Sequence, residues 1–392
     1  MSCVLIAALV SFAKADEVGG RAPCAAGAAA CDGGLRLNDI QAAGSHNSYK
    51  IAIPAYERRI IALTSAETAA GLDYSHVPIP EQLDLGMRQL ELDVFHDPEG
   101  GRYEKPLLPR ISSAGRAEPT WDSTGMDAPG LKVLHIQDID IRSHCNTFVL
   151  CLRQIKAWSD RHRDHAPILV LINAKDAEIA APGAVKPLAF DAAAYDRLDA
   201  EIRSVFPRRR LIVPDDVRGD APTLRDGAMN GGWPTLSAAR GRVMFALDET
   251  PAKVNVYRRG ARSLEGAACF VNTYDENAPD AAYFTMNDPL SDGEAIARRV
   301  RDGFIVRTRA DADTIEARTN DTSRRDAAFR SGAHYVSTDY YHPREEWSGY
   351  SARLPGDAVI RCNPVRAAPA CAPAGGADWT LDGEGLEDGA AK

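Results

Sequence analysis

The sequence lacks an apolar run long enough to cross a membrane. Its apolar stretch near the start, residues 3–10, is much shorter than the ~20 residues that a spanning helix needs. The sequence also lacks an excess of positive charge, because 46 Lys and Arg are outnumbered by 55 Asp and Glu and the formal net charge is −9. Phosphate binding needs clustered positive charge, so this balance argues against a nucleic-acid partner. The sequence also shows no amphipathic basic helix of the kind that would predict an anchor at the membrane interface.

Zinc-binding cysteine patterns are absent as well. None of the eight cysteines forms a Cys-x-x-Cys motif, and no cysteine group has histidine at ligand spacing. Six cysteines instead fall into close pairs, which predict local disulfides in an oxidising compartment, although pairing across loops stays open. The predicted pairs are Cys24 with Cys31, Cys145 with Cys151, and Cys362 with Cys371. Cys269 has no such neighbour, and we expect a buried free thiol.

The two ends of the chain differ in composition from the middle. Residues 1–15 contain a short apolar run followed by Ala13-Lys14-Ala15, the pattern of a signal peptide with its cleavage site, and they predict a secreted or periplasmic protein. Residues 16–35 are rich in Ala and Gly and predict a loose lead-in. Residues 366–392 are rich in Ala, Pro and Gly and acidic, which predicts a disordered tail. One domain over residues 36–365 remains.

Short apolar runs alternate with longer helical or loop stretches in this domain, which predicts an α/β fold with a parallel sheet. We expect helices over 192–206 and 292–301, and we assign the short run 211–214 to a connection. The eight predicted strands cover residues 40–45, 89–95, 131–136, 168–173, 242–247, 268–273, 304–309 and 335–340. Eight strands favour a closed (β/α)8 barrel, although a doubly wound sheet has the same local pattern.

Polar residues gather where these strands end, which is where a barrel builds its active site. Glu91 and Asp93 stand at i and i+2 on one strand and project to the same face. A divalent cation relieves the repulsion between them, and oxygen ligands favour Ca²⁺, or less readily Mg²⁺, over zinc. The alternative is a strand with its acidic face in water. His46 and His135 end the two flanking predicted strands, and such a pair can take up and release protons near neutral pH.

These motifs carry a family resemblance. Gly44-Ser45-His46-Asn47-Ser48-Tyr49, Glu91-Leu92-Asp93-Val94 and His135 resemble the Ca²⁺-dependent phosphatidylinositol-specific phospholipase C-like phosphodiesterases of the secreted bacterial type. The resemblance continues through 167–176, 304–311 and 332–341, and it implies a distorted TIM barrel. It further implies catalytic histidines at positions 46 and 135, and calcium held by Asn47, Glu91, Asp93 and Asn173.

The chain departs from this family at two places. Asn173 stands where the family usually has Glu, so the predicted site loses one negative charge and we expect weaker calcium binding. Asp248 and Glu249 follow the fifth predicted strand, where eukaryotic relatives have lysines that hold ring phosphates. Acidic residues repel such phosphates, so we expect unphosphorylated phosphatidylinositol as the substrate.

Several further residues have expected roles. Asp339 is expected to orient His46, because the last strand of a closed barrel lies beside the first; capping of the following turn is the alternative. Lys175 and Arg307 are candidates to bind phosphate or inositol hydroxyls, with salt bridges to Asp176 and Asp311 as the alternative. Tyr341, with Tyr340, is a candidate wall for the inositol ring. We assign no role to the histidines at 96, 144, 162, 165, 334 and 342, which we expect in loops or at the surface.

The sequence therefore predicts a monomeric phosphoric diester hydrolase that acts on a phospholipid at a membrane surface. The expected products are diacylglycerol and a cyclic inositol phosphate. A glycerophosphodiester or sphingomyelin-type phosphodiesterase on the same barrel remains an alternative. A catalytically weak, calcium-dependent lipid-binding module is a second alternative, supported by Asn173.

Overall fold

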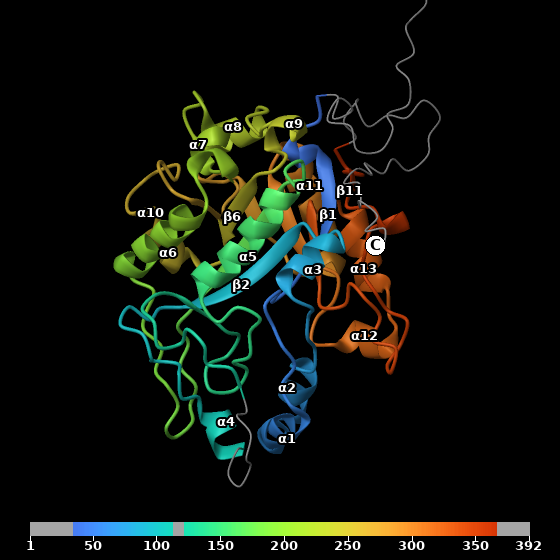
Figure 1. Ribbon diagram of the computed structural model, residues 1–392. Coiled ribbons are helices and arrows are strands. Elements are labelled where there is room, and N and C mark those ends of the chain that lie inside the picture. The colour runs from blue at the N-terminus through green and yellow to red at the C-terminus, as the bar shows by residue number, and fades with distance from the viewer. Residues whose placement is uncertain (1–33, 113–120, 367–392) are drawn as a thin grey trace, which may run out of the picture.

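The computed structural model describes residues 34–112 and 121–366, and parallel strands form its centre (Figure 1). These strands are β1 (Ile40–Ser45), β2 (Gln89–Phe95), β4 (Ile168–Lys175), β6 (Val243–Leu247), β7 (Cys269–Val271), β8 (Tyr283–Thr285), β9 (Ile305–Arg309) and β10 (Tyr335–Thr338). Parallel pairing links β7, β6, β4, β2, β1, β10, β9 and β8 in that order. A single parallel bridge between Asn272 and Tyr283 then connects β7 to β8. The sheet is therefore a distorted (β/α)8 TIM barrel, whose weakest contact is this bridge.

Three further strands supplement the barrel. β3 (Lys132–Val133) pairs antiparallel with the end of β2, and β11 (Ile360–Cys362) pairs antiparallel with β1. β5 (Leu211–Ile212) pairs in parallel with the start of β6. The barrel strands are almost entirely buried, and β4 is a nearly continuous apolar run, as expected for a parallel strand covered on both faces.

Helices surround the sheet and cover its outer face. The described helices are α1 (Ala55–Thr64), α2 (Ala66–Gly71), α3 (Ile79–Asp84), α4 (Leu107–Ser112), α5 (Phe148–Arg161), α6 (Ala192–Val205), α7 (Pro214–Arg218), α8 (Leu224–Met229), α9 (Leu236–Ala239), α10 (Pro251–Arg258), α11 (Pro289–Asp302), α12 (Ile315–Thr319) and α13 (Ser323–Arg330). The described short 3-10 helices are η2 (Leu37–Asp39), η3 (Arg208–Arg210) and η4 (Pro355–Asp357). α6 illustrates why the sequence forms these helices. Asp191 caps its start by accepting a hydrogen bond from the Ala194 N–H, and Tyr195, Leu198 and Ile202 form its buried apolar face.

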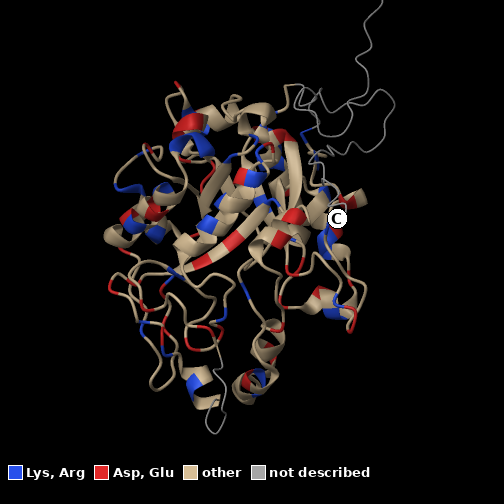
Figure 2. Ribbon diagram, viewed as in Figure 1, with Lys and Arg blue, Asp and Glu red and all other residues tan. Residues whose placement is uncertain are grey.

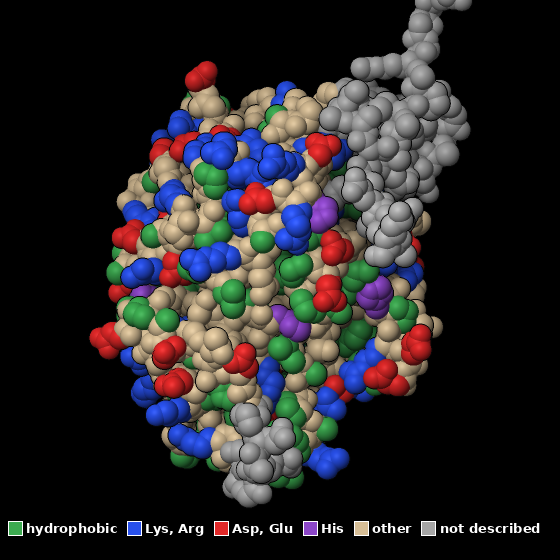
Figure 3. Space-filling model, in the orientation of Figure 1, with side chains coloured by type: hydrophobic (Ala, Val, Ile, Leu, Met, Phe, Trp, Pro, Cys, Tyr) green, Lys and Arg blue, Asp and Glu red, His purple; other side chains and the backbone are tan. Residues whose placement is uncertain are grey.

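The two ends of the barrel are built differently. α7, α8 and α9 lie at the end where the strands begin, whereas α1, α2, α4 and long loops lie at the opposite end (Figure 1). The loops that follow the carboxyl ends of β1 and β2 belong to this second group. Basic and acidic side chains alternate over most of the face shown in Figure 3, with a group of basic side chains near its upper edge. Among the described residues, the helices are too short or too polar to cross a membrane.

The predicted strands agree with the structure except at three places. Residues 131–136 do not form a barrel strand. Leu131, Val133 and Leu134 are apolar because they are buried beneath the loops that cover the end of β2. The eighth parallel strand is instead β8, which has three residues and gave no strand signal. Residues 211–214, assigned to a connection, contain the two-residue strand β5.

The cysteines follow the predicted pattern within the described residues. Cys145 and Cys151 form a disulfide that ties the loop before α5 to its first turn. Cys269 is free and buried on β7, as expected. Cys362 is disulfide-bonded. Its predicted partner Cys371 lies outside the described residues, as do the predicted Cys24/Cys31 pair, the predicted signal peptide, most of the predicted lead-in and the predicted tail.

Candidate active site

One cavity of about 190 Å³ opens at the carboxyl ends of the barrel strands. It is lined by His46, Asn47, Glu91, Asp93, His135, Asn173, Lys175, Asp248, Asn287, Arg307 and Arg309. Eight of these side chains are predicted site residues, and they come from five segments between residues 46 and 307. Of the other predicted residues, Asp339 lies behind His46, and Tyr341 faces a neighbouring pocket.

His46 follows β1 directly, and its backbone N–H donates to the Thr338 carbonyl of the adjacent β10. Its Nδ1 lies 2.9 Å from Oδ1 of Asp339. An ionised carboxylate only accepts hydrogen bonds, so this contact places the proton on Nδ1 and leaves Nε2 as an acceptor in the cavity. Arg309 Nη1 lies 3.4 Å from that Nε2, and Arg309 also pairs with Asp339 at 3.1 Å. The prediction that Asp339 contacts His46 agrees with this geometry.

The surroundings keep His46 neutral. Burial is the main cause that lowers its pKa well below the usual value, and the positive charge of Arg309 acts in the same direction. Glu91, whose Oε1 lies 3.7 Å from Nε2, opposes this shift without cancelling it. A neutral imidazole with an unprotonated Nε2 can accept a proton from a bound hydroxyl.

His135 lies on a loop beyond β3, not at the end of a barrel strand as predicted. A tight turn brings Asp140 back to it, so that Nδ1 of His135 lies 2.8 Å from Oδ2 of Asp140. The same carboxylate oxygen lies 2.7 Å from Nζ of Lys50, in an ion pair without solvent exposure. Burial opposes ionisation of Asp140, but Lys50 and His135 outweigh it and lower its pKa below the usual value.

Glu91 and Asp93 project into the cavity from β2, whose two acidic bands are visible in Figure 2. Both carboxylates are almost fully buried, and each forms an ion pair with a basic side chain. Oε2 of Glu91 lies 2.6 Å from Nη2 of Arg307, and Oδ2 of Asp93 lies 3.0 Å from Nζ of Lys175. The expected alternative partners of these two bases, Asp311 and Asp176, are not the ones observed. Oδ1 of Asp93 has no hydrogen-bond partner.

The two predicted asparagine ligands lie on either side of this carboxylate pair. Asn47 has a left-handed backbone, with φ of 48°, and its amide donates to the hydroxyl of Tyr74 at 2.7 Å. The Tyr49 hydroxyl donates to Oδ1 of Asn47 at 3.4 Å. Asn173 lies beside Asp93 in the β2/β4 register, and its amide donates to Oε1 of Glu91 at 2.9 Å.

The donor chemistry of this cavity fits calcium. Asn47, Glu91, Asp93 and Asn173 offer only oxygen ligands, which is the preference of Ca²⁺, and Oδ1 of Asp93 is a buried carboxylate oxygen that lacks a partner. The described residues contain no group of three or more His, Cys, Asp or Glu side chains at metal-holding distances. The four candidate ligands therefore include only two carboxylates, because asparagine stands at position 173.

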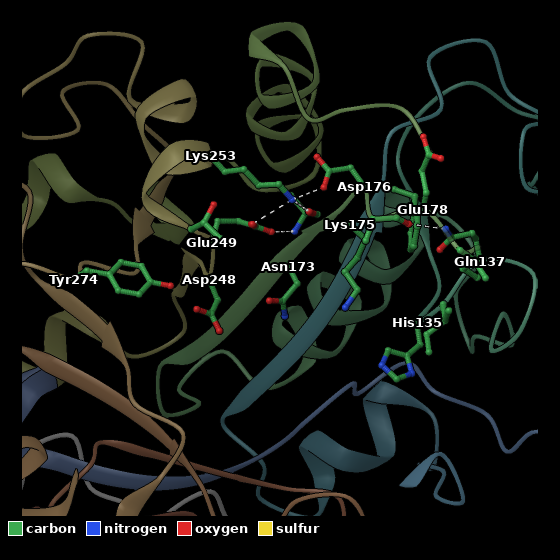
Figure 4. A pocket seen from close by; sticks show the side chains of 16 residues that line it. His135, Gln137, Asn173, Lys175, Asp176, Glu178, Asp248, Glu249, Lys253 and Tyr274 are labelled. Atoms are coloured by element: carbon green, nitrogen blue, oxygen red, sulfur yellow. Dashed lines mark hydrogen bonds and ion pairs between the residues drawn. The ribbon is translucent and has the colours of Figure 1, made fainter. Parts of the chain in front are cut away.

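A larger pocket of about 530 Å³ adjoins the cavity and shares His135, Asn173, Lys175 and Asp248 with it (Figure 4). Glu249 lines only the larger pocket. It accepts a hydrogen bond from the Ala174 N–H at 2.6 Å and pairs with Lys253 at 3.3 Å. Burial raises the pKa of Glu249 to about 7.

Tyr341 is turned away from the cavity. Its hydroxyl accepts a hydrogen bond from the Val77 N–H at 3.1 Å, and its ring stacks on His76 with 5.4 Å between centroids. Nε2 of His76 lies 2.7 Å from the His46 carbonyl oxygen and 3.8 Å from Asp339. This arrangement makes Tyr341 part of the packing behind His46, so it does not form the predicted wall of the cavity.

Five residues of the site had no expected role there: His76, Asp140, Asn287, Arg309 and, as a cavity residue, Asp248. Only Asp140 had a local signal, since it follows His135 by five residues and a carboxylate often orients a catalytic histidine. Two other histidines, expected at the surface, are buried: His165 bonds Ser159, and His334 bonds the backbone of Val306 and Asn38.

Comparison with known proteins places the chain in a family. A family model for Ca²⁺-dependent phosphoinositide phospholipase C matches residues 35–364. The structure resembles the calcium-dependent phosphoinositol-specific phospholipase C of a Pseudomonas species, with a TM-score of 0.52 and 17% identity over 85% of this chain and 97% of that one. The enzyme from Streptomyces antibioticus gives a TM-score of 0.49 and 17% identity over 78% of this chain and 95% of that one.

None of the curated protein sequences matches the chain. The Pseudomonas structure supports the barrel fold, and the family match covers the barrel together with both histidines and the carboxylate pair. The chain therefore belongs to the Ca²⁺-dependent phosphoinositide phospholipase C family, whose members are phosphoric diester hydrolases.

Proposed function

We propose that this protein cleaves phosphatidylinositol to diacylglycerol and a cyclic inositol phosphate, with His46 as base and His135 as acid. One observation carries the proposal. Two histidines, each held at Nδ1 by a buried carboxylate, line the same cavity as the oxygen ligands Glu91 and Asp93.

The reaction is an intramolecular transfer at phosphorus. Nε2 of His46 takes the proton of the inositol 2-hydroxyl, and the oxygen attacks the adjacent phosphorus. As the new P–O bond forms, the P–O bond to diacylglycerol breaks, and His135 gives a proton to the leaving oxygen. Asp339 and Asp140 stabilise the positive charge that each imidazole carries when protonated.

The other cavity residues hold the phosphate and the cation. Asn47, Glu91, Asp93 and Asn173 would hold calcium, which when bound lowers the pKa of a hydroxyl and neutralises charge on phosphoryl oxygens. Arg309 lies 3.4 Å from Nε2 of His46 and would stabilise the charge that develops on the phosphoryl oxygens. Arg307 and Lys175 each hold one carboxylate, and both remain candidates to contact phosphate or inositol hydroxyls.

The acidic lining favours an unphosphorylated ring. Asp248 borders both the cavity and the adjoining pocket, and Glu249 borders the pocket. Additional ring phosphates placed there would meet negative charge. The Cys145–Cys151 disulfide supports a secreted or periplasmic location, because such bonds persist in oxidising compartments.

Release of diacylglycerol from phosphatidylinositol vesicles, with calcium or with EDTA, tests the proposal. We expect calcium-dependent release, and we expect His135→Ala to lose it while calcium binding survives. Near-normal turnover by that variant would refute the assigned acid. Faster hydrolysis of glycerophosphocholine than of phosphatidylinositol would instead favour the glycerophosphodiesterase alternative.

A further inference from the structure

We infer that Asp248 supplies the negative charge that the cation site lacks at Asn173. The inference rests on the proposed function, because it concerns the calcium that the same cavity would hold. An acidic residue at position 173 of β4 would place a negative charge beside the cation. Asp248, which follows the neighbouring strand β6, provides this charge instead.

Strand register places Asp248 beside Asn173. β4 and β6 pair in parallel up to Ile172 and Leu247, and the Asp248 N–H donates to the Ile172 carbonyl at 2.8 Å. β2 and β4 likewise pair Asp93 with Asn173. Residues at one level of neighbouring parallel strands face the same side of the sheet. Figure 4 shows the side chains of Asn173 and Asp248 next to each other and directed the same way.

Charge distinguishes Asp248 from the other carboxylates that line the cavity. Glu91 is paired with Arg307, and Asp93 with Lys175, so the two carboxylates expected to bind calcium are each matched by a base. Asp248 has no ion-pair partner among the residues that the structure describes. The positive charge of Arg307 favours the ionised form of Asp248, but Arg307 is already paired with Glu91.

Neutral neighbours hold Asp248 in place. Nδ2 of Asn272 donates to Oδ1 of Asp248 at 2.9 Å. The Thr285 N–H donates to Oδ1 of the same asparagine at 2.9 Å, which fixes the direction of its amide. The carboxylate of Asp248 is thus positioned by hydrogen bonds that leave its charge in place, although burial raises its pKa.

A separate observation indicates that this cavity takes a cation. Oδ1 of Asp93 is a buried carboxylate oxygen with no hydrogen-bond partner, on a side chain that lines the cavity. Such an oxygen is costly to leave unsatisfied, and a cation satisfies it. Glu91, Asp93 and Asp248 do not form a direct three-carboxylate cluster. Asp248 therefore acts from outside the first ligands, through the field in the cavity or through a water on the ion.

Calcium titration by calorimetry in low-salt buffer tests the inference without any turnover. We expect Asp248→Asn to weaken calcium binding about 10- to 100-fold, the usual effect of an outer-shell partner. Asn173→Glu added to that variant should restore most of the affinity, because it returns the charge to the adjacent strand. Asp248→Ser, which removes the same charge with a smaller polar side chain, should also weaken calcium binding and keeps the inference testable if Asp248→Asn does not fold.

Asp176→Asn is the matched control. Asp176 also follows β4, but its carboxylate pairs with Lys253 at 2.8 Å and does not line the cavity. We expect its loss to leave calcium affinity unchanged. Thermal unfolding in EDTA shows whether each variant is folded.

The outcomes separate this inference from the proposed function. Unchanged affinity in Asp248→Asn, or no recovery in the double variant, would overturn the inference alone. An unsubstituted protein that binds no calcium would overturn it together with the calcium requirement. Weaker binding in Asp248→Asn by a protein that does not cleave phosphatidylinositol would support the inference and refute the proposed reaction.

Discussion

Nδ1 of His135 lies 2.8 Å from Oδ2 of Asp140, and this contact repeats at His46, whose Nδ1 lies 2.9 Å from Oδ1 of Asp339. Each carboxylate is buried and is also bound by a base, Lys50 in one case and Arg309 in the other. Both imidazoles therefore direct Nε2 toward the cavity. Lys50 and His135 outweigh burial and lower the pKa of Asp140, whereas burial outweighs Arg309 and raises the pKa of Asp339.

Asp140→Asn should reduce both stability and turnover. The substitution removes the charge that balances the fully buried Lys50, and loss of one partner of such a pair costs about 3–5 kcal/mol. It also removes the carboxylate that orients His135, so we expect kcat to fall about 10²- to 10⁴-fold. Urea unfolding and initial rates at a temperature where the variant is folded measure the two effects separately.

Lys50→Met in the Asp140→Asn background separates the buried pair from catalysis. It removes the uncompensated charge, so we expect most of the lost stability to return while turnover stays low. Recovery of both quantities would show that Asp140 acts on turnover only through stability.

Asp339→Asn should lower kcat by about 10²- to 10⁴-fold. An asparagine amide can donate to Nδ1 of His46, which would shift the proton to Nε2 and remove the base from the cavity. Calcium binding should survive, because Asp339 does not line the cavity. A kcat close to that of the unsubstituted enzyme would exclude a role for Asp339 in holding the His46 tautomer.

Lys175→Met should tighten calcium binding by about two- to five-fold, equivalent to about 0.4–1 kcal/mol for a partly exposed ion pair. Lys175 competes with any cation for Oδ2 of Asp93, and its side chain is 36% exposed, so its loss should disturb the fold little. Lys253→Met is the control, because Lys253 pairs with Glu249 and Asp176 outside the cavity. Weaker binding in Lys175→Met would contradict competition at Asp93.

His334 should make the fold sensitive to acid. Burial lowers the pKa of His334 to about 4, and its Nδ1 accepts a hydrogen bond from the Val306 N–H, which a second ring proton would break. An unfolded histidine has a pKa of about 6.5. Between these values the unfolded state binds the extra proton, so stability is lost as pH falls from about 6.5 toward 4, by about 1.4 kcal/mol per pH unit.

His334→Gln should remove this contribution. We expect the difference in unfolding free energy between the unsubstituted protein and the variant to shrink by about 2 kcal/mol between pH 7 and pH 5. Denaturant unfolding in EDTA at the two pH values measures it. A difference that stays constant with pH would contradict the lowered pKa.

The sequence predicted most of the barrel because buried parallel strands are runs of apolar residues. Residues 40–45 and 89–95 are strands with the expected bounds, since each is flanked by polar or turn-forming residues. The same rule failed at 131–136, where apolar residues pack beneath loops, and at β8, which is too short for its pattern to stand out. Burial without periodicity does not separate a strand from a buried loop.

The candidate site was predictable where chemistry and strand position coincide. Glu91 and Asp93 share a face because of the two-residue period of a strand, and Asp339 meets His46 because β10 pairs with β1. Arg309 and His76 could not be assigned in this way, since their contacts depend on side-chain direction and on a loop path. The sequence indicated only that Asp248 would repel ring phosphates. Its position beside Asn173 depends on the register between β4 and β6, which the sequence does not reveal.

The loop position of His135 divides the site into two parts of different origin. His46 and the carboxylate pair belong to barrel strands or their immediate ends, whereas His135 belongs to the long excursion between β2 and α5, which the Cys145–Cys151 bond ties to that helix. Insertions or deletions in this excursion can therefore reshape the side that meets the departing alcohol while the attacking side stays intact. Within such an architecture, preference for the leaving group can change in evolution independently of preference for the headgroup.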